Sequence, residues 1–108
     1  MSAGPADRAA FGELADRIES EMRSAGVGPT PAPAVPITGG PFGAPEATFF
    51  QWLEHVLCPR LREIAAGRSE PPPHSEVATA AARNFDGYDG TDGLLAALAK
   101  VDRLAGSR

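Results

Sequence analysis

The chain has 108 residues and a net charge of −4, with 43% apolar and 22% charged residues. This length and composition fit one globular domain and exclude a disordered chain. The basic residues are scattered singly, which argues against direct nucleic-acid binding, because that needs a basic patch or stripe. The sequence therefore predicts a single helical domain over residues 1–108, with frayed ends at 1–4 and 106–108.

The single cysteine, Cys58, excludes an internal disulfide and favours a reducing compartment. No apolar run follows a basic start near Met1, so we expect no secretory signal. No stretch reaches the roughly 18 apolar residues that a membrane-spanning helix needs. We therefore expect a cytoplasmic protein that makes no contact with a membrane.

The first predicted helix runs from about Pro5 to Ala25, where apolar side chains recur at steps of three and four residues. This narrow stripe consists of Phe11, Leu14, Ile18 and Met22. Gly26 and Gly28 end the helix. Residues 27–44, rich in proline and glycine, are expected to cross to the next helix in an extended conformation. The side chains expected to attach this crossover to the core are Val35, Ile37 and Phe42.

The second predicted helix, from about Pro45 to Ala66, forms the centre of the domain. Its apolar residues cover about half of the helix circumference, which is wider than the stripe of a typical surface helix. This width predicts contacts with several neighbours at once. Pro59 cannot donate a hydrogen bond and crowds the carbonyl of His55, so we expect a kink near residues 55–59.

Two shorter helices are predicted after a triple proline. Ser75 is expected to cap the first, over residues 76–84, and an acidic glycine-rich loop leads to the second, from about Thr91 to Leu104. Four amphipathic helices without a strand pattern predict an all-α, up-and-down four-helix bundle with a long Pro/Gly-rich crossover between helices 1 and 2. The predicted core residues are Phe11, Leu14, Ile18, Phe49, Trp52, Leu53, Val56, Leu57, Leu94, Leu98 and Val101.

The segment from Pro41 to Leu61 resembles the signature of the YqcC-like family of small bacterial proteins. The matching pieces are Pro41-Phe42, Gln51-Trp52-Leu53, Val56-Leu57 and Pro59-Arg60. The chain departs from the family pattern at Pro45-Glu46, where an Asp-Thr pair is frequent, and at His55, where a second aromatic is common. The resemblance implies a compact helical bundle without assigned catalytic residues. It also implies an accessory role beside a tRNA pseudouridine synthase, because family genes often neighbour one.

His55 and Cys58, three residues apart on a helix, are the one candidate pair of base and nucleophile. A zinc site needs three or four ligands, so two residues do not make one, and we expect no metal and no cofactor. A reactive thiol needs a nearby positive charge to lower its pKa, and the sequence offers only Arg60. Cys58 is therefore predicted to be partly buried and inert.

Arg60 is the position that the sequence singles out for a partner. At roughly 100° per residue it falls inside the apolar arc of the second helix, with Cys58 opposite. A charge there must pair with a carboxylate of a neighbouring helix, reach water, or face a partner. Both pairing and docking stay open, and we place a candidate docking surface around Arg60, with His55 and Arg62 nearby.

The sequence favours a small helical protein-interaction or accessory module, linked to tRNA pseudouridine modification, over an enzyme. The expected partner is a protein such as a tRNA pseudouridine synthase. The alternative is a small-molecule-binding protein or an enzyme whose site lies near His55 and Cys58. Whether the chain is an enzyme stays open, and no catalytic residue is assigned.

Overall fold

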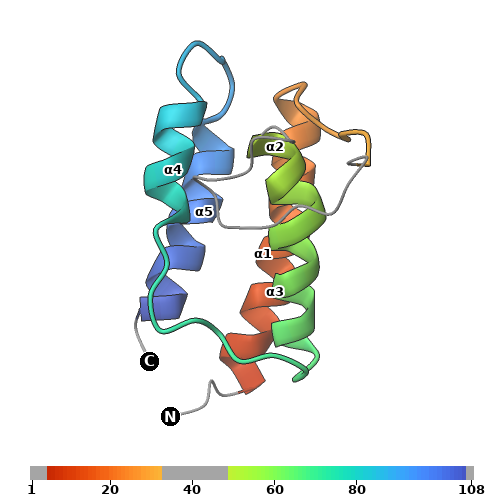
Figure 1. Cartoon of the computed structure of the whole chain (residues 1–108), viewed down its shortest axis with the longest axis vertical. Helices are drawn as coiled ribbons and strands as arrows, with labels where there is room; N and C mark the ends of the chain where they lie inside the picture. Colours follow the sequence, from red (N-terminus) through yellow and green to blue (C-terminus); the bar gives the residue numbers. More distant parts are fainter. Residues whose placement is uncertain (1–4, 33–48, 107–108) are drawn as a thin grey trace.

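The computed structural model describes residues 5–32 and 49–106 of the chain. Within these ranges the regular structure consists of four helices and contains no strand (Figure 1). The helices are α1 (Pro5–Ser24), a continuous helix made of α2 (Phe49–Trp52), a π-helical turn (Leu53–Leu57) and α3 (Cys58–Ala65), then α4 (Val77–Asn84) and α5 (Asp92–Gly106). The predicted all-helical class is confirmed for these residues.

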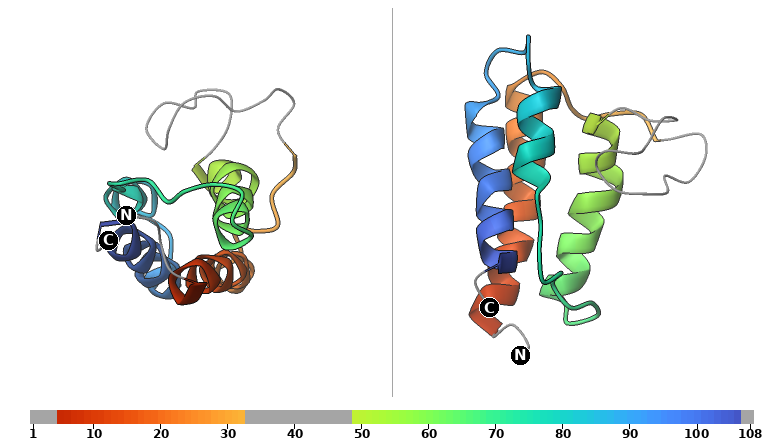
Figure 2. Two further views of the ribbon diagram at one scale, coloured as in Figure 1. Left: turned by 90° about the horizontal axis from the view of Figure 1, so that it is seen from below. Right: turned by 60° about the vertical axis from the view of Figure 1, so that its left-hand side comes forward.

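The helices follow one another around an arc in the order α4, α5, α1 and α3 (Figure 2). In each successive pair the two helices pack directly against each other. Helices α1 and α4 run in one direction, and α3 and α5 run in the other (Figure 1). Helix α1 therefore lies between two neighbours, α3 and α5, and has a separate interface with each.

The predicted core residues are buried except for Val56, which is partly buried and packs against the core. An aromatic cluster joins the start of the second helix to the loop between α4 and α5. Phe49 stacks on Trp52 with ring centroids 6.0 Å apart, and Phe50 stacks on Phe85 at 5.6 Å. Tyr88 meets the Phe50 ring edge-on at 5.1 Å and is 50% exposed. The cluster attaches the second helix to the α4–α5 pair across the arc.

The N-terminus of helix α4 is capped by Asp102, a residue of α5. The N–H groups of Val77 and Ala78 donate to the two carboxylate oxygens of Asp102, on α5, at 3.0 and 2.8 Å. The Ser75 hydroxyl donates to the same carboxylate at 2.5 Å. A negative group at this end satisfies free N–H groups and interacts favourably with the helix dipole. The predicted Ser75 cap is therefore wrong, because a carboxylate of the neighbouring helix takes its place.

The second helix departs from the ideal wheel at the π-helical turn. The N–H of Cys58 donates to the carbonyl of Leu53, five residues back instead of four. This wider turn lies just before Pro59, whose ring crowds the carbonyl four residues back. The irregularity expected near residues 55–59 thus takes the form of a π-turn, after which the helix continues.

The π-turn rotates the residues that follow it relative to the predicted wheel. Cys58, predicted opposite the apolar arc, is fully buried. Arg60, predicted inside the arc, is exposed. Both positions on the helix wheel are wrong for the same reason, since each assumed an uninterrupted α-helical period across residues 53–57, whereas the prediction of a buried Cys58 side chain agrees with the structure.

The predicted crossover lies outside the described residues beyond position 32. The same holds for its expected core contacts, Val35, Ile37 and Phe42, and for the predicted helix start at Pro45. None of the helices in the described ranges combines the length and the apolar composition that a bilayer crossing requires.

Candidate functional site

Cys58 lies in the contact between α3 and α1. Its side chain is fully buried, and Sγ donates a hydrogen bond to the carbonyl oxygen of Ala15 at 3.6 Å. Burial, together with the negative charge of Glu19, raises the pKa of the Cys58 thiol from its ordinary 9.0 to about 12. The thiol is therefore protonated at neutral pH, and nucleophilic chemistry needs the thiolate.

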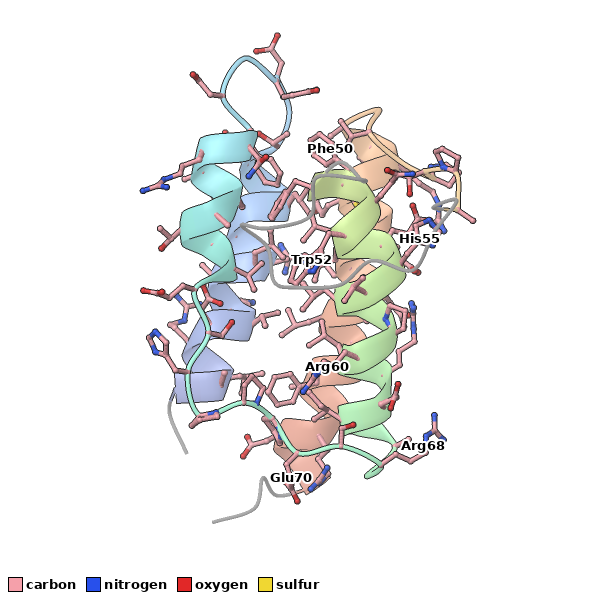
Figure 3. All side chains as sticks on the ribbon, viewed as in Figure 1. Phe50, Trp52, His55, Arg60, Arg68 and Glu70 are labelled. Carbon is pink, nitrogen blue, oxygen red and sulfur yellow. The ribbon has the colours of Figure 1, made fainter. Side chains whose placement is uncertain are left out.

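His55 belongs to a polar cluster that attaches the segment after α1 to the π-helical turn (Figure 3). Glu54 Oε1 accepts hydrogen bonds from the N–H and the hydroxyl of Thr30 at 2.6 and 2.7 Å. His55 Nε2 lies 3.3 Å from the Thr30 carbonyl oxygen. Burial opposes ionisation of Glu54, but the hydrogen bonds from Thr30, together with the nearby basic side chains of His55 and Arg23, outweigh it and lower the pKa of the carboxyl. His55 and Cys58 thus contact different neighbours.

Arg62, which also belongs to the predicted docking set, is hydrogen-bonded to carboxylates of α1. Its Nη2 lies 2.7 Å from Glu19 and 2.9 Å from Asp16. These hydrogen bonds raise the pKa of the guanidinium, so the side chain stays positively charged. Arg60 is exposed and has no hydrogen bond or ion pair with any described residue. Of the alternatives left open at Arg60, no ion pair with a neighbouring helix is formed among the described residues, whereas Arg62, two residues later, forms one.

Within the described ranges, no three His, Cys, Asp or Glu side chains are grouped so that they could hold a metal ion. His74 has one carboxylate partner, Glu76, at 3.6 Å, and both side chains are exposed. Asp92, at the end of the acidic glycine-rich loop, lies in the first turn of α5. A negative charge there interacts favourably with the helix dipole and stabilises the helix.

An open groove of about 470 Å³ lies between α1 and α5. Its apolar lining consists of Ala10, Leu14 and Leu104. Its charged lining consists of Glu13, Arg17, Lys100 and Arg103. Leu14 is buried and Leu104 is partly buried against the core, so the apolar lining is continuous with the interior. The groove combines an apolar floor with three cations and one carboxylate.

The sequence does not predict this groove, because its two sides come from opposite ends of the chain. The apolar pattern places Leu14 in the core, and the basic residues stand singly along the sequence. One signal was present: Arg17 directly precedes Ile18 of the α1 stripe, and Lys100 directly precedes Val101 of the α5 stripe. Only the packing of α1 against α5 brings Arg17 and Lys100, which border these two stripes, to the same groove.

Residues 11–104 match the model of a protein family described as DUF446, tRNA pseudouridine synthase C. Comparison with curated proteins and with solved structures gave no match. The matched span reaches from Phe11 in α1 to Leu104 in α5 and so includes residues of all four described helices. Since it covers most of the sequence, the chain belongs to the family described as tRNA pseudouridine synthase C.

Proposed function

We propose that the chain is a protein-interaction or accessory module that acts together with a tRNA pseudouridine synthase and does not itself catalyse the reaction. The family description supports a link to tRNA pseudouridine modification. The resemblance to YqcC-like proteins, carried by residues 41–61, supports an accessory role within that link.

The observation that carries this proposal is the separation of His55 from Cys58. The thiol is buried against α1 with a raised pKa, whereas the imidazole lies against the Thr30 carbonyl. A nucleophile and its base need to lie within hydrogen-bond reach of each other. These two side chains instead stabilise two different contacts of the second helix.

The charge of the chain supports a protein partner over direct tRNA binding. A net charge of −4 repels a phosphate backbone, and binding to nucleic acid depends on neutralising phosphates with clustered cations. In this proposal the synthase binds the tRNA, and the chain binds the synthase. Arg60, exposed and without a partner among the described residues, is a proposed contact.

We also infer that the four helices form an up-and-down bundle, in which residues 27–44 cross from the first helix to the second. The alternating directions of the described helices support this topology (Figure 1). Such a bundle offers rigid helix faces, which suit a binding module because little ordering is needed on association.

The test is to mix the purified chain with the tRNA pseudouridine synthase of the same genome. Native mass spectrometry should detect a complex, and the chain alone should form no pseudouridine in tRNA. Arg60→Ala should weaken the complex without changing the melting temperature, while Arg68→Ala, also at an exposed position, should leave both unchanged. Pseudouridine formation by the chain alone, or no complex at all, would contradict the proposal.

A further inference from the structure

We propose that the groove between α1 and α5 binds an acidic, amphipathic segment of the partner protein. This inference rests on the proposed function and names the chemistry of the segment that the partner presents. Apolar side chains of the segment lie on Ala10, Leu14 and Leu104, and its carboxylates lie against the basic rim. No feature of the second helix is needed for this contact.

The floor of the groove, formed by Ala10, Leu14 and Leu104, is apolar. Leu14 is 7% exposed and belongs to the core, and Leu104 packs against that core from the neighbouring helix. The groove holds about 470 Å³, within the range of roughly 300–1,000 Å³ of sites that bury a ligand. A groove between two helices suits a segment that places apolar anchors at intervals of three and four residues.

The rim of the groove, formed by Glu13, Arg17, Lys100 and Arg103, carries a net positive charge. Arg17, Lys100 and Arg103 face a single carboxylate, Glu13, on a molecule whose net charge is −4. The Arg17 Nε lies 4.0 Å from Glu21, and both side chains are partly exposed, so this pair is weak. Lys100 and Arg103 are exposed and have no ion pair within the described residues. The rim is thus a local positive site on an acidic surface, complementary to carboxylates.

A protein segment fits these observations better than a nucleic acid. A phosphate backbone gains from cations but cannot use the apolar floor, and Glu13 on the rim repels it. An acidic amphipathic helix uses both parts of the groove. The arginine side chains add planar guanidinium groups that suit bidentate recognition of carboxylates.

The experiment titrates the full chain with a synthetic amphipathic helical peptide that carries leucines on one face and glutamates on both flanks. Binding is measured by fluorescence anisotropy and located by NMR shifts of α1 and α5. A second peptide has glutamine for every glutamate, and a short single-stranded RNA is the third probe. We expect saturable binding of the acidic peptide, with Kd at least about tenfold higher for the neutral one.

Variants of the chain locate the site. Arg103→Glu should raise Kd for the acidic peptide by at least about tenfold, because it places like charges together. Arg68→Glu, the same charge change in the exposed turn that follows α3 (Figure 3), should leave Kd within about twofold, since exposed charges away from the groove are screened. Shifts confined to other helices, equal binding of the neutral peptide, or tighter binding of the RNA would overturn the inference.

The same variants separate this inference from the proposed function. If the synthase forms a complex with the chain and Arg103→Glu leaves that complex intact, the groove assignment fails and the accessory role stands. If no complex with the synthase forms while the acidic peptide still binds the groove, the accessory role fails and the groove remains a binding site.

Discussion

Helix α1 has a different neighbour on each side, and its two interfaces treat polar groups in opposite ways. In the contact between α1 and α3, which we call the seam, Arg62 is paired with carboxylates of α1, and the Cys58 thiol is buried. In the α1–α5 groove, Lys100 and Arg103 border an apolar floor without an ion pair among the described residues. The polar groups of the seam stabilise the fold, whereas we propose that those of the groove bind the partner.

The largest expected effect concerns the reactivity of Cys58 in the seam. With a folded-state pKa of about 12 in place of 9.0, the thiolate fraction at pH 8 falls by about a thousandfold. Native protein should therefore react with a thiol reagent about a thousandfold more slowly than urea-unfolded protein. A native rate within about tenfold of the unfolded rate would show that the seam is open.

The same raised pKa predicts how stability responds to alkaline pH. The folded state holds the thiol proton more tightly than the unfolded state does. The stabilisation that the protonated Cys58 thiol gives to the fold is therefore fully present below pH 9.0 and is lost as the pH rises toward 12. The matched control is Cys58→Ala, which should show a weaker decline of the melting temperature over this range.

The next effect compares added volume on the two sides of α1. A side chain at Gly12 would meet the Ala65 Cβ at 3.1 Å, so Gly12→Leu should lower the free energy of unfolding by about 1–3 kcal/mol. Ala10→Leu adds volume inside the groove and should change it by less than about 0.5 kcal/mol. Denaturant melts measure both. Equal destabilisation by the two variants would contradict the contrast between a closed seam and an open groove.

A smaller effect is expected at Arg62. Its side chain is 40% exposed, so its ion pairs are partly screened and Arg62→Gln should cost about 1 kcal/mol. A double-mutant cycle with Glu19→Gln isolates the pair, and its coupling should shrink at high salt. A coupling energy of zero at low salt would show that the pair contributes nothing to the seam.

The helices themselves were predictable, because each has a strong apolar period. The stripe from Phe11 to Met22 predicts α1, and the stripe that begins at Leu94 predicts α5. These patterns depend only on residues close together in the chain, which is why the predicted bounds of α1, α4 and α5 are close to those observed.

Three features of the structure were not predictable from local patterns. The π-turn changes the register of one helix, so the positions predicted for Cys58 and Arg60 on the helix wheel are wrong. The cap of α4 comes from Asp102, whose carboxylate accepts from an N–H group 25 positions earlier in the sequence. The groove needs α1 and α5 side by side. Each of these features depends on tertiary packing, and the spacing of apolar residues along the sequence carries no information about that packing.

The most direct test of the contrast between seam and groove measures two variants in two assays. Arg103→Glu and Arg62→Gln are each assayed for melting temperature and for Kd of the complex with the tRNA pseudouridine synthase. We expect Arg103→Glu to raise Kd by at least about tenfold with an unchanged melting temperature, and Arg62→Gln to lower the melting temperature with an unchanged Kd. A lower melting temperature with an unchanged Kd for Arg103→Glu would show that the groove is structural and would contradict the account.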